Sequence, residues 1–257
     1  MNNNKDFFTK DEDEKILFAR LSDKVGSAVK TCRPTFSYFL DPYTAHKAAD
    51  FFRSRDIVTF AYGGYEDAER LIVGFFPEYC PVDKEEFPLK AIEVSYNGKF
   101  SRPLTHREYL GSVMGLGINR EMVGDICLKE EGAVVFVCER VADYILTGLE
   151  RVSRTAVKTK ELKEYTLAPK TKKEKRLTIA SLRVDRLLSA AFNISGSKSS
   201  EAVKSGKVFI NWKEENSPSK LLKEGDIITL RGSGRVKIDS VVGVTKKDRI
   251  AINIIIY

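Results

Sequence analysis

The chain is poor in the residues that build metal and redox sites. Its four cysteines form no CxxC pair, and its two histidines, His46 and His106, lie far apart in the sequence. A zinc site needs about four clustered ligands. We therefore expect no metal and no cofactor, and we expect the cysteines to be small buried hydrophobic residues.

Long apolar runs are also missing. No run reaches the roughly 18 to 20 residues that a transmembrane helix needs. The first residues, MNNNKDFFTKDEDEK, are polar and acidic and lack the apolar core of a signal peptide. With 257 residues and 42% hydrophobic content, the chain can fold into one large domain or two to three small ones. We expect a cytoplasmic protein with no membrane partner.

Positive charge is concentrated in one part of the chain. Residues 171–240 contain 15 Lys and Arg against 8 Asp and Glu, a balance of +7, whereas the remaining residues contain 28 of each. A concentrated basic balance is typical of proteins that bind a polyanion. On charge alone, a solvated basic face that aids solubility is an equally good interpretation.

The first block, residues 1–83, predicts an N-terminal α/β domain. In FLDPYTAHKAADFF, Asp41 is placed to cap a helix and Pro42 to occupy its first position. In IVTFAYGGYEDAERLIVGFFP, two apolar runs flank Gly63 and Gly64, which predicts a hairpin.

The second block, residues 84–165, predicts a βαββαβ domain. LKAIEVSY, EMVGDICL, GAVVFVC and RVSRTAVKT are predicted strands, and LTHREYLGSVMGLG and ERVADYILTGL are predicted helices. Thr105 and Glu108 form a capping box, and Gly115 and Gly117 supply the helix stop. This ferredoxin-like order also occurs in RNA-recognition modules, which stack bases on aromatics of two central strands. Here those strands offer Phe136 and little else, so a structural and a base-reading role both remain open.

The third block follows a charged linker, residues 166–176. Residues 177–257 begin with helical signals and continue with short strands at GKVFINW, DIITLRGSGRVKI, SVVGVT and RIAINIIIY. Together the blocks predict an α+β, multidomain protein.

The first helix of this block predicts one buried and one basic side. Its apolar stripe at i, i+3, i+4 and i+7 consists of Val184, Leu187, Leu188 and Ala191. Arg183 and Arg186 share a neighbouring face. Asp185, near the helix N-terminus, either favours the helix dipole or orients an arginine.

A second helix start follows in ISGSKSSEAVKSGK. Ser195 or Ser197 can cap it, and Lys198 joins the hydroxyls and amides there, which favours phosphate binding. Lys204 and Lys207 extend the positive surface. Val208, Ile210 and Trp212 then alternate toward one face of a strand, and we expect Trp212 in the core.

Arg-x-Asp, a short helix, Ser-x-Ser-Lys, another short helix and Gly-Lys-Val-x-Ile-Asn together resemble the S4 domain, over about residues 177–240. The resemblance implies that the two helices and their turn face structured RNA. The RNA-binding residues it implies are Arg183, Asp185, Arg186, Ser195, Ser197, Lys198, Lys204, Lys207, Asn211 and Lys213. The family usually has an arginine where this chain has Gly196, which removes one expected phosphate contact.

Motifs elsewhere resemble the YlmH family of bacterial RNA-binding proteins. They are FLDP, GGYEDAERLIVGFFP, LTHREYLGSVMGLGINREMVGDI and CERVADYI. The resemblance implies an N-terminal domain, an RNA-recognition-like middle domain and an S4 domain. It also implies binding to rRNA and tRNA on the large ribosomal subunit stalled with peptidyl-tRNA, in ribosome-associated quality control. Some family members are linked to cell division.

Two other functions remain as alternatives to a non-catalytic, monomeric RNA binder. One is an rRNA-modifying enzyme of the pseudouridine-synthase type that uses the S4 domain as a grip; its tempting signal is the Arg-x-Asp of Arg183 and Asp185, which we interpret as part of the S4 helix. The buried helical stripe runs through Asp185, and the upstream residues show no metal cluster, phosphate loop or nucleophile motif. His106 lies within the capping box, which favours a surface role. The other alternative is a protein-interaction scaffold built on the neutral first 165 residues.

Overall fold

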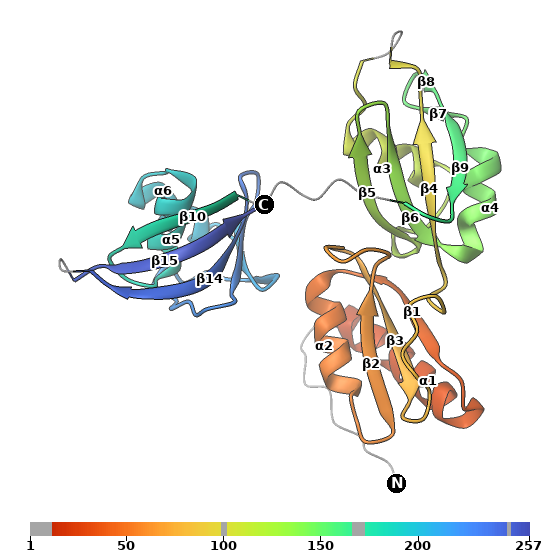
Figure 1. Cartoon of the computed structure of the whole chain (residues 1–257), viewed down its shortest axis with the longest axis horizontal. Helices are drawn as coiled ribbons and strands as arrows, with labels where there is room; N and C mark the ends of the chain where they lie inside the picture. The colour runs from red at the N-terminus through yellow and green to blue at the C-terminus, as the bar shows by residue number, and fades with distance from the viewer. Residues whose placement is uncertain (1–11, 99–101, 166–172, 246–247) are drawn as a thin grey trace. The chain divides into compact units, whose positions relative to one another are not determined.

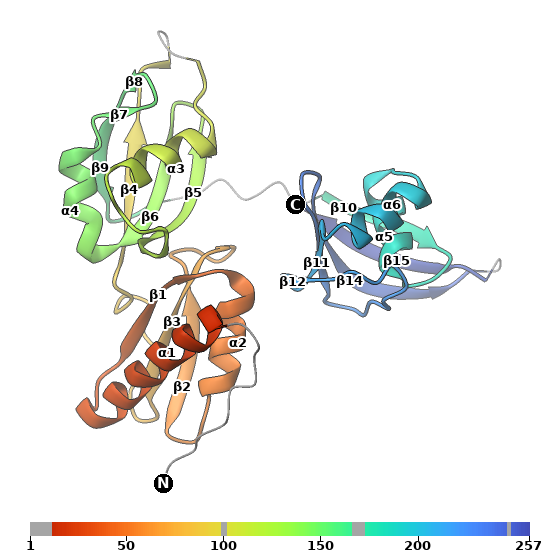
Figure 2. The same cartoon turned by 180° about the vertical axis from the view of Figure 1, so that it is seen from behind.

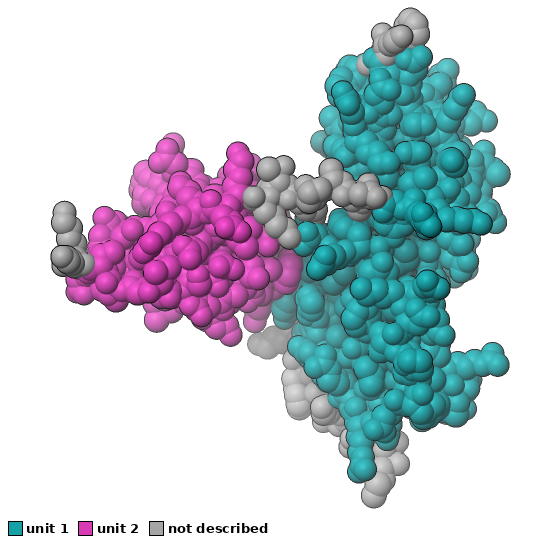
Figure 3. All heavy atoms as spheres, viewed as in Figure 1, with its two compact units in different colours: residues 1–167 teal, residues 168–257 magenta. Residues whose placement is uncertain are grey.

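The computed structural model describes residues 12–98, 102–165, 173–245 and 248–257. It consists of two compact units, residues 1–167 (unit 1) and residues 168–257 (unit 2) (Figure 3). Both units combine helices with antiparallel sheets, which confirms the α+β multidomain class (Figure 1).

Unit 1 begins with two helices and a three-stranded sheet. Its elements are α1 (Glu12–Thr31), β1 (Thr35–Leu40), α2 (Pro42–Phe52), β2 (Ile57–Tyr62) and β3 (Leu71–Pro77), with sheet order β1-β3-β2. The α2 start is as predicted, because the Thr44 amide donates to the Asp41 carboxylate at 3.1 Å and Pro42 begins the helix. The predicted hairpin is β2–β3. Both strand pairs are antiparallel, so this region is α+β rather than the expected α/β. The sequence patterns did not reveal β1.

The remainder of unit 1 has the predicted βαββαβ order. Its elements are β4 (Leu89–Ser95), α3 (His106–Gly115), the 3-10 turn η2 (Arg120–Met122), β5 (Val123–Lys129), β6 (Gly132–Cys138), α4 (Glu139–Gly148) and β9 (Lys158–Leu162). The sheet order is β5-β6-β4-β9, with antiparallel neighbours. Helices α3 and α4 lie on the same face of this sheet (Figure 2).

The strand expected at RVSRTAVKT is instead a tight hairpin followed by a strand. The hairpin pairs β7 (Arg151–Val152) with β8 (Thr155–Ala156), and the fourth sheet strand starts only at Lys158. Ser153 adopts φ 55 at the turn, a left-handed conformation that ends the extended run.

Both faces of β6 are buried, which explains its uninterrupted apolar sequence. Val135 and Val137 pack into the core beneath α3 and α4. Val134 and Phe136 pack on the opposite face into a second cluster that includes Phe39 and other side chains of the N-terminal sheet. The two sheets of unit 1 therefore share this second apolar cluster.

A polar cluster of Tyr65, Arg70, Arg120 and Asp125 (the Arg70–Asp125 cluster) joins the same two sheets. The Asp125 carboxylate accepts the Tyr65 hydroxyl at 2.6 Å and the backbone amides of Glu69 and Arg70 at 2.7 and 3.1 Å. The Arg70 guanidinium donates to the carbonyls of Phe39, Arg120 and Val123. Residues distant in sequence are thus held by half-buried polar contacts.

Unit 2 is a six-stranded sheet with two helices. Its elements are β10 (Lys173–Ile179), α5 (Val184–Phe192), α6 (Gly196–Lys204), β11 (Val208–Ile210), β12 (Lys213–Glu214), β13 (Ile227–Leu230), β14 (Gly234–Val244) and β15 (Ile250–Ile256). The order is β10-β15-β14-β13-β11-β12. Both helices pack their apolar sides on one sheet face, seen from the helix side in Figure 2.

Two features of unit 2 differ from expectation. The last four residues of the expected linker, 173–176, belong to β10, while residues 166–172 lie outside the described residues. GRVKI and SVVGVT form the single strand β14, which bends at two register shifts instead of ending.

Candidate nucleic-acid interface

The predicted apolar stripe of α5 is buried and sets its basic side outward. Val184, Leu187 and Leu188 have no solvent exposure, whereas Arg186 is exposed. The first two α5 amides, of Val184 and Asp185, donate to the carbonyls of Lys220 and Pro218. The start of α5 is therefore occupied by the protein's own loop.

Arg183 and Asp185 form an ion pair within the chain. The Arg183 Nη2 and Nε atoms lie 2.9 and 3.1 Å from the two Asp185 carboxylate oxygens. The Asp185 side chain is 6% exposed and the Arg183 side chain 38% exposed. Asp185 thus orients the arginine, one of the two roles considered for it, and its buried carboxylate cannot reach a large ligand directly.

The start of α6 gathers the other predicted groups (the helix face: Arg186, Ser195, Gly196, Ser197 and Lys198). Ser195 caps the helix, because its hydroxyl accepts the Lys198 amide at 3.3 Å, and it lies 3.0 Å from the Ser197 hydroxyl. Ser195, Ser197 and Lys198 are exposed. A methyl group built on Gly196 would lie 3.8 Å from the Arg186 guanidinium. Arg186 therefore supplies positive charge beside the position where the S4 family usually has arginine.

The other predicted residues separate into two groups. Lys204, Lys207 and Lys213 are exposed, at the end of α6, before β11 and in β12. The Asn211 side chain serves the fold, because its amide donates to Asp226 at 2.9 Å and its oxygen accepts the Ile227 amide at 2.9 Å.

Trp212 does not lie in the core as expected, because the strand that would direct it there, β11, ends at Ile210. Asn211 and Trp212 adopt φ values of 48 and 64, so the Trp212 side chain departs from the core direction of Val208. Trp212 is half-buried, and the Arg235 guanidinium lies 5.9 Å from its ring centroid. The guanidinium of Arg231 lies 5.1 Å from the Phe209 ring. Neither Arg231 nor Arg235 was among the residues predicted to bind RNA, although RGSGR between two strands was the available signal.

RNA-recognition modules read bases with one face of their sheet. In unit 1 the corresponding face is covered by other side chains at Phe136. The Phe136 side chain has no solvent exposure and contacts Tyr65 in a stacked and Tyr165 in an edge arrangement, both at 5.2 Å. Toward the other end of the same face, Glu93 and Lys129 form an ion pair at 2.9 Å. Of the two roles left open for the middle domain, base stacking on Phe136 is therefore excluded by burial.

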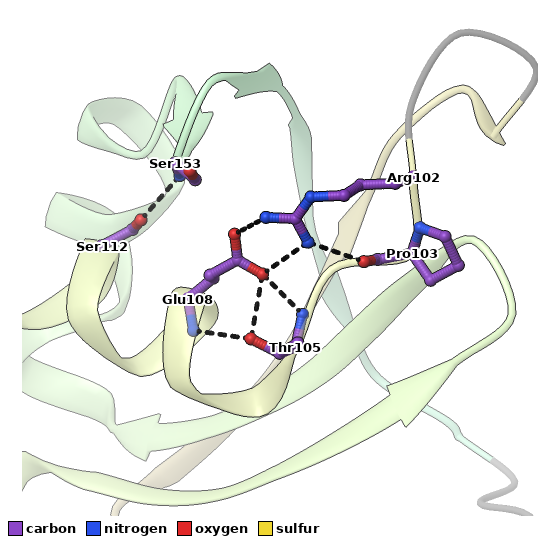
Figure 4. Close-up of polar contacts among 6 residues, drawn as sticks. All are labelled: Arg102, Pro103, Thr105, Glu108, Ser112 and Ser153. Carbon is purple, nitrogen blue, oxygen red and sulfur yellow. Dashed lines mark hydrogen bonds and ion pairs between the residues drawn. The ribbon is translucent and has the colours of Figure 1, made fainter.

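The LTHREYLGSVMGLG motif forms a helix with a strongly bonded start (Figure 4). The Glu108 carboxylate accepts bonds from the Thr105 amide and hydroxyl and from the Arg102 guanidinium, the last at 2.5 and 3.1 Å. The Arg102 contact, then the Thr105 bonds, lower the pKa of Glu108 to about 2. The Ser112 hydroxyl accepts the Ser153 amide at 3.2 Å and so fixes the β7–β8 hairpin to α3. These contacts explain the motif as a local framework.

Burial is the largest cause of the pKa changes of Arg70 and Tyr65 in the Arg70–Asp125 cluster. It lowers the pKa of the Arg70 guanidinium to about 10, with Arg120 adding to the effect. Burial, followed by the hydrogen bond to Asp125, raises the pKa of the Tyr65 hydroxyl, which therefore remains a donor at neutral pH.

Within the described ranges, no group of three or more His, Cys, Asp or Glu side chains is arranged to hold a metal ion. Over those ranges, the helices are also too short or too polar to cross a membrane.

Comparisons with known proteins agree with the two-unit organisation. Residues 82–166 match the family described as "Putative RNA-binding domain in YlmH", and residues 182–228 match the S4 domain. The chain is 33% identical over 213 residues to the "Ribosome-associated protein quality control protein P2" of Bacillus subtilis (strain 168), covering 82% of each protein. A solved structure, "Cell division protein ylmH from Streptococcus pneumoniae", has a similar fold, with a TM-score of 0.50 at 22% identity over 61% of this chain and 94% of that chain.

Proposed function

Because the chain belongs to the YlmH family of RNA-binding proteins, we propose that it binds rRNA and tRNA on the large ribosomal subunit without catalysis. It acts there as a cytoplasmic monomer in the quality control of stalled peptidyl-tRNA complexes. The ribosomal setting is supported by the similarity to the ribosome-associated quality control protein of Bacillus subtilis.

The observation that carries the proposal is the helix face. Arg186 and Lys198 are exposed cations beside the serine hydroxyls at the start of α6, and Lys204 and Lys207 are exposed cations farther along the chain. Cations and hydroxyls at a helix N-terminus are suited to phosphate oxygens. Asp185 and Asn211 act as positioning residues, because their side chains are engaged within the chain.

The test is a double substitution, Arg186→Ala with Lys198→Ala, which leaves the Arg183–Asp185 ion pair intact. We expect this variant to lose co-sedimentation with purified large ribosomal subunits while keeping its circular dichroism spectrum. The matched control also removes one exposed arginine and one exposed lysine, Arg20→Ala with Lys30→Ala on α1, outside the two regions that match RNA-binding families, and should co-sediment normally. Normal co-sedimentation of the helix-face variant would move the interface elsewhere.

Salt dependence provides a second readout of the same proposal. If about five phosphates are neutralised, the log–log slope of affinity against salt should be about −3.5 to −4.5. A slope near zero contradicts phosphate-dominated binding.

The enzyme alternative predicts a nucleotide modification that disappears from rRNA when the gene is deleted. Mapping modified nucleotides in strains with and without the gene distinguishes this alternative from non-catalytic RNA binding.

A further inference from the structure

Two arginine–aromatic pairs lie at one end of the unit 2 sheet. Arg231 lies over Phe209, and Arg235 lies over Trp212. Arg231 follows the last residue of β13, and Arg235 is the second residue of β14. Between them, Gly232 in the loop and Gly234 at the start of β14 adopt φ values of 84 and 129. Glycine takes such values without steric cost, so the RGSGR sequence brings the two guanidiniums to neighbouring strand ends.

Strand register places these groups on the sheet face opposite the helices. Phe209 is directly opposite Thr229, and Thr229 is directly opposite Arg235, so the three side chains share a face. The Arg235 Nε donates to the Thr229 hydroxyl at 3.3 Å. The intervening side chains of Ile228 and Val236 are fully buried against the helices. We name Phe209, Trp212, Thr229, Arg231 and Arg235 the outer sheet face.

The backbone at Trp212 is held in a conformation that large side chains rarely adopt. Two successive residues other than glycine, Asn211 and Trp212, have left-handed φ values. Asp226, which is 5% exposed, holds this turn by accepting the Asn211 side-chain amide and the Lys223 backbone amide, both at 2.9 Å. Strained backbone that the surrounding structure holds in place is often found at functional sites, so the turn at Asn211 and Trp212 is a candidate for one.

We infer that the outer sheet face is a second RNA contact, which stacks unpaired bases on Trp212 and Phe209 with Arg235 and Arg231. The inference rests on the proposed RNA binding and adds the class of RNA segment that this surface takes. Flat rings and guanidiniums accept the faces of any base, and the positive charges attract the adjoining phosphates. Lys237 shares this face and adds charge, since it lies opposite Ile227, the next outward position on β13. Glu214, opposite Phe209, places a carboxylate on the same face.

The two surfaces suit different parts of a folded RNA. The helix face presents cations and hydroxyls without aromatic side chains, which suits the backbone of a structured segment. The outer sheet face presents rings, which suits bases that have left a stack. One unit can therefore engage a double-stranded segment and its unpaired neighbour from opposite sides of its sheet.

The test uses the fact that Trp212 is the chain's single tryptophan. The whole protein is titrated with a labelled single-stranded RNA of about 10 nucleotides, and label anisotropy and tryptophan emission are recorded together. We expect binding with quenching of the emission, because a stacked base quenches indole fluorescence. An abasic oligonucleotide of the same length should bind through its phosphates without quenching.

Substitutions at Trp212 separate stacking from packing. Trp212→Leu should weaken binding of the base-containing RNA about 5- to 100-fold, and Trp212→Phe should restore most of the affinity. Circular dichroism checks the fold of both variants. If Trp212→Leu does not fold, the quenching experiment on the unmodified protein still decides.

The outcomes distinguish this inference from the proposed function. Unchanged anisotropy with every RNA, structured or single-stranded, would contradict RNA binding itself. Binding without quenching, with equal affinity for the Trp212→Leu variant, would overturn the outer sheet face as a contact while leaving the helix face intact. Equal quenching by the abasic oligonucleotide would also overturn base stacking.

Discussion

The Arg70–Asp125 cluster makes a quantitative prediction about unit 1. Asp125→Asn preserves the size of the side chain but replaces one of its acceptor oxygens with an NH2 donor. The carboxylate accepts two bonds on Oδ2 and one on Oδ1. The more stable orientation of the new side chain therefore keeps an oxygen at the Oδ2 position, where it accepts from Tyr65 and Glu69. The NH2 group then takes the Oδ1 position, and the hydrogen bond from the Arg70 amide is lost.

The expected cost follows from those three bonds. Leaving the Arg70 amide without its acceptor costs about 1–3 kcal/mol. The two surviving bonds lose the extra strength that an ionised acceptor gives, about 0.5–1 kcal/mol each. Because Asp125 is only half-buried, we expect a total of about 2–4 kcal/mol. With a urea dependence of about 2 kcal/mol per molar, the unfolding midpoint of unit 1 should fall by roughly 1–2 M.

Two optical signals separate unit 1 from unit 2 in this assay. Tryptophan emission reports unit 2 alone, since Trp212 is the single tryptophan, whereas far-ultraviolet circular dichroism reports both units. The Asp125→Asn variant should lower the midpoint of the unit 1 component of the dichroism and leave the tryptophan transition unchanged. Asp143→Asn, at an exposed position on α4, is the matched control and should change stability by less than about 0.5 kcal/mol.

Two results would refute this reasoning. A midpoint equal to that of the unmodified protein would mean that the cluster does not stabilise the junction of the two sheets. A parallel shift in tryptophan emission would mean that the units do not unfold independently.

Two further predictions concern unit 1. Gly64→Ala should destabilise it by about 3–5 kcal/mol, because Gly64 has φ 102 and a methyl group there would lie 2.4 Å from the Phe136 ring. The control is Gly117→Ala, where φ is 82 but the space around the added methyl group is open, and it should cost only about 1–2 kcal/mol. Thermal unfolding measures both costs, and equal costs would contradict the steric argument. Glu108 has a folded pKa of about 2 against an ordinary 4.5, so its stabilising contribution is complete above pH 4.5 and is lost as the pH falls toward 2. The difference in melting temperature between the protein and its Glu108→Gln variant should shrink over that pH range, and a constant difference would contradict the assignment.

Local chemistry was readable from the sequence. The Asp41 cap with Pro42, and the Thr105–Glu108 capping box, were predicted from residues three or fewer positions apart and are present. The buried stripe of α5 was predicted for the same reason, since helical periodicity repeats within two turns. Such features depend only on neighbouring residues.

Elements that depend on distant partners were missed. The β10 sequence KEKRLTI resembles a solvated linker, because only Leu177 and Ile179 point into the core and pairing with β15 defines the strand. The Arg70–Asp125 cluster joins positions 55 residues apart and leaves no periodic signal. The covering of Phe136 likewise depends on how two separate sheets pack.

Candidate site residues showed the same limit. The sequence offered Arg186 and Lys198 as candidates, but it did not show that Arg186 lies beside Gly196. It placed Trp212 in the core by strand alternation, which two left-handed residues interrupt. Only the structure shows that Asp185 and Asn211 are engaged within the chain.

The position of β15 between β10 and β14 has a practical consequence for fragments of this protein. Its sequence, IAINIII, is uncharged, lacks proline and favours extended backbone, which are the properties of segments that assemble into amyloid-like fibres. Strand β10, which has charged residues at its first four positions, pairs with one edge of that segment and covers it. A truncated S4 fragment that begins after Ile179 would leave this edge bare, and intermolecular strand pairing would compete with its solubility.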